Sequence, residues 1–168
     1  VYARDIIHIE PLGLDPEAAL GWLRAAPGAG ALVMALLLTH CPPMKRAGRN
    51  MFLAVAGFGI VTIGFGISRN FWFSIVMLFL AGFFDMISVV VRHTLLQLRT
   101  PNEMRGRVSA VSTIFIGSSN ELGGFESGVV ARIFNPVVSV VSGGIGTLLI
   151  VGLWAKWFPS LRKLETMN

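Results

Sequence analysis

Two charged residues lie within one of the most apolar stretches of the chain, and their spacing could serve a chemical purpose. Asp85 and Arg92 belong to the sequence FLAGFFDMISVVVRHTLLQL, which runs from Phe79 to Leu98. Seven residues make about two turns of an α-helix, so both side chains should project from one face. An aspartate among apolar residues is costly to keep charged, which suits a group that binds and releases protons. The alternative is a buried ion pair that fixes this helix against a neighbour.

The composition indicates an integral membrane protein. Of 168 residues, 54% are apolar and only 14% are charged, and the mean hydropathy is +0.69. Soluble domains carry about 25% charged residues. The net charge of +5 requires no nucleic-acid partner, because membrane proteins concentrate Lys and Arg in their cytoplasmic loops. No aromatic residues are interleaved with basic runs, so nucleic-acid binding is not expected.

Five apolar stretches are long enough to cross a bilayer as helices, since each has at least the ~17 residues that a span needs. Asp15-Pro16 and Asn135-Pro136 each offer an N-cap followed by proline at the first helical position. Thr100-Pro101-Asn102-Glu103 has the pattern of a capping box. The predicted spans are 20–41, 51–68, 71–98, 108–134 and 137–158.

The basic residues predict the orientation of these spans. Nine Lys and Arg residues fall on one side and three on the other, which makes the first side cytoplasmic under the positive-inside rule. The C-terminus is then cytoplasmic and the first ten residues are external, so we expect a further helix before them. The nine are Lys45, Arg46, Arg49, Arg99, Arg105, Arg107, Lys156, Arg162 and Lys163, and the three are Arg4, Arg69 and Arg132.

Charge also divides the spans into two classes. The spans 51–68 and 137–155 carry no charge, which predicts peripheral helices, whereas Arg24, Glu121 and Glu126 mark two further spans as internal. With a helix before residue 1, the peripheral helices are the third and sixth of six, and such repeats are common in secondary transporters. Small residues support close helix packing on the internal spans: Gly28, Gly117, Gly124 and Gly128.

Three motifs resemble the C-terminal half of a major facilitator superfamily transporter. The sequence RTPNEMRGRVSAV at 99–111 is similar to the loop after helix ten, and PPMKRAGRN at 42–50 is similar to the basic loop between helices eight and nine. The sequence FIGSSNELGGFESG at 115–128 resembles helix eleven of bacterial members of the enterobactin-exporter type, a drug and siderophore efflux class. The resemblance covers the whole chain. The loop at 42–50 departs from the pattern because it lacks the acidic residue of the full motif.

The resemblance implies an all-α integral membrane fold, with five complete transmembrane helices plus the end of a sixth, half of a 12-helix bundle. The span 71–98 would line the central cavity, with Asp85, Arg92 and Glu121 as candidates for transport and coupling. The spans 20–41 and 108–134 would meet the N-terminal six-helix half through Arg24, Gly28, Gly117, Gly124 and Gly128. The cytoplasmic loops would take part in gating through Arg46, Arg49, Arg105 and Arg107. The partners implied are the lipid bilayer, the other half and a small-molecule substrate.

No other chemistry is indicated. His8, His40 and His93 are too far apart in sequence to suggest a metal site, and the single Cys41 rules out an internal disulfide. The glycines of 57–66 follow no strand, so close helix packing is a better explanation than a nucleotide site. We therefore expect no cofactor, no metal and no enzymatic activity. Two functions remain: half of a gradient-driven exporter in the inner membrane, or a non-transporting helical membrane protein that binds or scaffolds a partner, for instance as a homodimer.

Overall fold

The protein is built from long helices, and the structure, a computed structural model, describes residues 15–40 and 47–157. The described part contains no strand, as the all-α prediction requires. Each long helix begins within about one turn of a predicted span. The elements are α2 (Pro16–His40), α3 (Ala47–Ile67), α4 (Phe71–Arg99), the short 3-10 helix η2 (Asn102–Met104), α5 (Arg105–Ile133) and α6 (Pro136–Trp157).

Four of the five long helices have the length and apolarity of membrane spans. These are α2, most of α3, α4 and α6, whereas α5 is not among them. Glu121, Glu126 and a run of serines and glycines make α5 less apolar than its neighbours. The expectation of five complete spans and the end of a sixth is therefore met in part, and the crossing by α5 stays a prediction.

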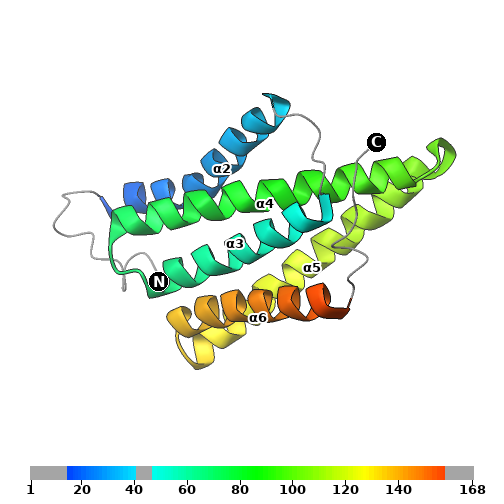
Figure 1. The fold of residues 1–168 in the computed structure, drawn as a ribbon. Coiled ribbons are helices and arrows are strands. Elements are labelled where there is room, and N and C mark those ends of the chain that lie inside the picture. Colours follow the sequence, from blue (N-terminus) through cyan, green and yellow to red (C-terminus); the bar gives the residue numbers. More distant parts are fainter. Residues whose placement is uncertain (1–14, 41–46, 158–168) are drawn as a thin grey trace.

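The helices pack in the spatial order α2, α4, α3, α6, α5 (Figure 1). The span 51–68, which carries no charge and forms most of α3, contacts both α4 and α6, so among the described helices it does not lie at the edge as the charge pattern suggested. The helix at the far edge is α5, whose contacts are mainly with α6 and η2. Many large apolar side chains on the outside of this group are exposed, as expected for surfaces that meet lipid.

Polar side chains set two helix boundaries, one of them as predicted. The side-chain oxygen Oδ1 of Asn135 accepts a hydrogen bond of 2.9 Å from the backbone N–H of Val137, which caps α6 directly before Pro136. The second cap was not predicted: Oδ1 of Asn70 accepts hydrogen bonds from the N–H groups of Trp72 and Phe73 at the start of α4.

The predicted capping box at 100–103 is wrong. The Thr100 hydroxyl donates to the carbonyl of Leu96 at 2.6 Å, so it closes the end of α4 and does not cap α5. Pro101 explains the difference, because a residue before proline avoids the helical conformation and Thr100 is accordingly extended. The helix α5 begins only at Arg105, after η2, with no side-chain cap.

Glycines allow two pairs of helices to approach closely. A Cβ atom at Gly30 of α2 would collide with the backbone oxygen of Phe79, and one at Gly82 of α4 with that of Pro27. On the other side of α4, Gly59 of α3 and Gly144 of α6 lie backbone against backbone, and a Cβ at Gly144 would come within 2.9 Å of the Gly59 oxygen. Close packing through the glycines of 57–66 is therefore confirmed at Gly59.

Successive helices run in opposite directions, which separates the basic residues (Figure 1). One end of the group carries Arg49, Arg99, Arg105, Arg107 and Lys156, and the other carries Arg69 and Arg132. The residues Lys45, Arg46, Arg162, Lys163 and Arg4 lie outside the described residues. The separation agrees with the predicted orientation without testing it.

Cysteine labelling will test both the orientation and the crossing by α5. In a Cys41→Ser background, a cysteine at Glu103, before α5, should react with an impermeant maleimide only in inverted vesicles. A cysteine at Phe134, after α5, should react only in cells with a permeabilised outer membrane, because the positive-inside rule predicts that the basic end faces the cytoplasm. Both side chains are exposed. Labelling of both from one side would exclude the crossing, and the opposite pattern would reverse the orientation.

Candidate transport site between α4 and α5

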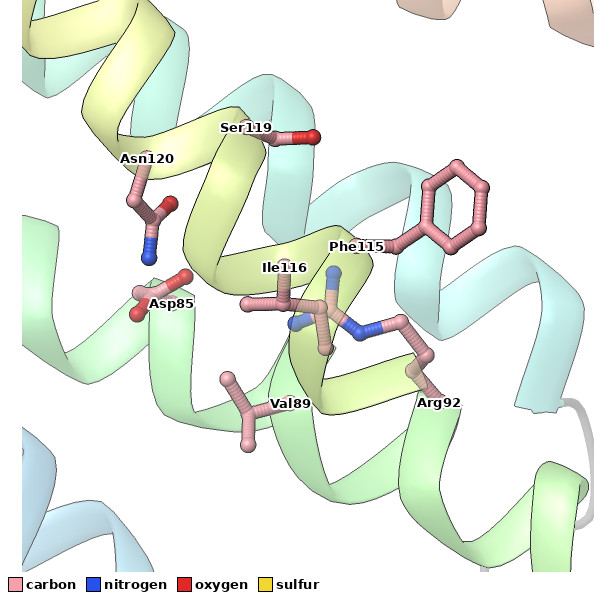
Figure 2. A pocket seen from close by; sticks show the side chains of 7 residues that line it. All are labelled: Asp85, Val89, Arg92, Phe115, Ile116, Ser119 and Asn120. Atoms are coloured by element: carbon pink, nitrogen blue, oxygen red, sulfur yellow. The ribbon is translucent and has the colours of Figure 1, made fainter. Parts of the chain in front are cut away.

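An open hollow of about 360 Å³ lies between helices α4 and α5. Polar and charged groups from both helices line it together with apolar side chains, as Figure 2 shows. We call this space the α4–α5 hollow. The residues that line it are Asp85, Val89 and Arg92 from α4, and Phe115, Ile116, Ser119 and Asn120 from α5.

Asp85 and Arg92 lie on the same face of α4, as their spacing predicted, and both face the hollow. Both side chains are exposed. Within the part of the chain that the structure describes, neither has an ion-pair or hydrogen-bond partner, so the buried ion pair considered for Asp85 has no counterpart among these residues. Their role in transport or coupling stays a prediction.

The helix α5 contributes polar groups to the hollow that sequence reasoning missed. Figure 2 shows the amide of Asn120 directed toward Asp85, with Ser119 beside it on α5. The predicted candidate, Glu121, does not line the hollow, because one residue along a helix turns the side chain by about 100°. Ser119 and Asn120 would have been found by asking which residues lie three and four positions after Ile116, on the same face of α5.

Away from its contacts with α6 and η2, much of the surface of α5 has no described neighbour. The helix has no buried residue, and the phenyl groups of Phe115 and Phe125 are 71% and 73% exposed. A Cβ atom at Gly117, Gly124 or Gly128 would meet nothing within 4 Å. Glycines on a helix face that has no described neighbour leave room for another helix to pack closely. The contact with the other half that the sequence suggested is therefore possible at this face and stays a prediction.

The other candidates are accessible but not gathered into one site. On α2, Arg24 is exposed and a Cβ at Gly28 would meet nothing within 4 Å. Among the loop arginines, Arg46 lies outside the described residues, and Arg49 and Arg107 are exposed at the starts of α3 and α5. Arg105 donates from Nε to the carbonyl of Thr100 at 3.2 Å. The described residues contain no group of three His, Cys, Asp or Glu side chains that could hold a metal ion.

Comparison with known proteins gives the family. The model of the transmembrane secretion effectors, a family of the major facilitator superfamily, matches residues 6–168. The enterobactin exporter EntS of Escherichia coli O1:K1 / APEC is 30% identical over 136 residues, which are 81% of this chain and 32% of that protein. EntS of Shigella flexneri is also 30% identical over 136 residues, which are 33% of its length. No solved structure matches.

The chain thus spans about a third of the length of the curated relatives it matches. The match extends over all the described helices, including α5. Together with the four apolar helices it identifies an inner-membrane protein in contact with the lipid bilayer. The chain therefore belongs to the transmembrane secretion effector family of the major facilitator superfamily.

Proposed function

We propose that this chain is the C-terminal half of a secondary active exporter that moves a small molecule out of the cell against its gradient, driven by an ion gradient. The observation that carries the proposal is the α4–α5 hollow, where Asp85 and Arg92 stand exposed and unpaired among the described residues. Unpaired charges at membrane depth are expensive, and they are characteristic of ion and substrate pathways. The family and the exporters among its relatives support the direction of transport.

The two charges have different roles in this proposal. Asp85 carries the coupling proton: protonation removes the charge and lowers the cost of closing the helices around the hollow. The guanidinium of Arg92 attracts an anionic group of the substrate. The amide of Asn120, directed toward Asp85 (Figure 2), adds a polar group beside the carboxyl, and Phe115 and Ile116 contact the apolar part of the substrate.

The proposal includes a second six-helix half that covers α5 and α2. The exposed glycines of α5 and its exposed aromatic side chains form a surface that suits helix packing in a membrane. Secondary transporters place their site at the interface of two such repeats. In this arrangement the C-terminus is cytoplasmic, and the protein is a transporter without enzymatic activity.

Everted membrane vesicles test this function. Enterobactin is the first probe because the relatives are named as its exporters. The full-length protein containing this chain should accumulate labelled enterobactin in vesicles with an imposed proton gradient, and a protonophore should prevent accumulation. The 168-residue chain alone should give no flux, because half of the pathway would be missing.

Different results would contradict different parts of the proposed function. Flux that persists after the gradient is collapsed would exclude proton coupling. Flux from the 168-residue chain alone would show that it forms a complete pathway, for example as a homodimer. If enterobactin fails, a panel of hydrophobic anions and cations measured in the same vesicles separates a wrong substrate from absent transport.

A further inference from the structure

A second pocket lies where the end of α4 and the start of α5 are joined through η2. Its volume is about 390 Å³, within the range of roughly 300–1,000 Å³ found for ligand pockets. We call it the junction pocket. It is lined by His93, Leu96, Gln97 and Thr100 from the end of α4, and by Arg105, Gly106 and Ser109 from the start of α5.

Its chemistry suits an anion. Arg105 is fixed at one point, since Nε donates to the carbonyl of Thr100 at 3.2 Å. The terminal nitrogens of the guanidinium keep their N–H groups for a ligand. His93, Gln97 and Ser109 add donors from the walls. None of the seven described lining residues carries a carboxylate, so nothing in the lining competes for the guanidinium.

The Thr100 hydroxyl does not contribute a donor, because its hydrogen is already used by the carbonyl of Leu96 at 2.6 Å. This bond has a positioning effect instead. It ends α4 at Thr100 and leaves the Thr100 carbonyl directed to Arg105, so the turn and the guanidinium are held together. This contact favours a guanidinium position at the pocket before any ligand binds, which would lower the entropy lost on binding.

The surroundings add positive charge. Arg99 ends α4 and Arg107 follows Arg105 on α5, both exposed. The pocket thus lies at the basic end of α4 and α5, which the predicted orientation and the predicted crossing by α5 would place near the phospholipid headgroups of the cytoplasmic leaflet. We propose that the junction pocket binds a phosphate group, held by the Arg105 guanidinium with His93, Gln97 and Ser109. Arginine matches the geometry of phosphate through paired N–H···O bonds.

A phosphate at this place has two possible sources. One is the headgroup of an anionic phospholipid, since basic pockets between helices on the cytoplasmic side of membranes bind such headgroups. The other is a soluble phosphate from the cytoplasm. The same side chains would hold either group, so the experiment has one arm for each source.

The test uses the full-length protein and the variant Arg105→Gln, with Arg107→Gln as the matched control. Both substitutions remove one exposed arginine from the same helix, but only Arg105 lines the pocket. In the first arm, native mass spectrometry measures binding of phosphatidylglycerol to protein that was purified with phosphatidylcholine. In the second arm, thermal unfolding measures the stabilisation by inorganic phosphate relative to chloride at equal ionic strength.

We expect Arg105→Gln to weaken binding of the effective probe by about tenfold, the usual effect of losing a charged hydrogen bond, and Arg107→Gln, which removes only a nearby exposed charge, to weaken it much less. His93→Gln, which keeps a donor, should weaken it less. An effect confined to phosphatidylglycerol identifies the lipid source, and one confined to phosphate identifies the soluble source.

Equal losses in the two arginine variants would reveal general attraction to a basic surface and overturn the proposal. The proposal would also be overturned if Arg105→Gln left the binding of both probes unchanged. If Arg105→Gln does not fold, the comparison of His93→Gln with Arg107→Gln decides: His93→Gln must be the weaker binder of the two. Transport is measured in none of these arms, so their outcome is independent of the proposed export.

Discussion

Replacing Asp85 with asparagine is expected to abolish gradient-driven export while the protein keeps its normal abundance in the membrane. Asparagine retains the shape of the side chain but has no titratable proton, so the coupling step is lost. Abundance should be normal because the described structure gives Asp85 no ion-pair partner that the substitution would leave unpaired. Export into everted vesicles and the amount of folded protein are measured on the same preparations.

The outcome separates coupling from a structural ion pair. If a basic residue of the other half pairs with Asp85, the substitution leaves a buried charge unpaired, which typically costs about 3–5 kcal/mol, and abundance falls with export. Arg92→Gln should lower the affinity for an anionic substrate and leave coupling intact. Glu126→Gln is the matched control, because Glu126 is exposed on α5 and does not line the hollow. Normal export by Asp85→Asn would leave Asp85 with neither role.

Alanine at Gly82 is expected to destabilise the protein more than alanine at most other glycines of the chain. The added Cβ would collide with the backbone oxygen of Pro27, a group that no side-chain rotation can move away. Overpacking of this kind costs typically about 1–3 kcal/mol, and the helices α2 and α4 must separate to relieve it. Gly30→Ala should act in the same way through Phe79. Thermal unfolding of the purified protein gives the measurement.

Two glycines without close neighbours, Gly21 in α2 and Gly143 in α6, provide controls for these substitutions. Gly21→Ala lies on α2 like Gly30, but its Cβ would meet nothing within 4 Å, so helix propensity should leave stability unchanged or raise it by up to about 1 kcal/mol. In α6, Gly144→Ala should destabilise the protein, whereas Gly143→Ala should not, since only Gly144 touches α3. Equal effects within these pairs would mean that the close contacts described here are absent from the protein in its membrane.

Helix positions could be predicted from the sequence because their signals are local. Proline at the first position and a capping asparagine mark the start of α6 without reference to other helices. At Thr100 the same local reasoning failed, because its hydroxyl had a choice between the carbonyls of the helix behind it and the amides of the helix ahead. The proline that follows decides this choice in favour of α4.

Helix contacts were harder to predict, because spacing marks a small-residue face but not the helix that it meets. Gly117, Gly124 and Gly128 have the expected spacing, yet a Cβ atom there would meet no described residue. Gly30 and Gly82 lie where α2 and α4 cross closely, although no repeated small-residue spacing predicted that contact. The same limit applies to the site. The face shared by Asp85 and Arg92 follows from one helix, but Asn120 enters the α4–α5 hollow only through the crossing of two.

The weak apolarity of α5 has a consequence for how the protein is made. A charged side chain near the bilayer centre costs about 2.5–3.5 kcal/mol on insertion scales, and α5 carries two glutamates, while the helix that follows it carries no charge before Lys156. The hydroxyl of Ser139 in α6 donates to the carbonyl of Ser127 in α5 at 2.8 Å. We infer that the two helices leave the translocon as one hairpin, with α6 supplying the hydrophobic free energy that α5 lacks. In a truncated chain that ends at Asn135 and has been released from the ribosome, cysteines at Glu103 and Phe134 should then be exposed on the same side of the membrane. Exposure on opposite sides would show that α5 inserts without α6.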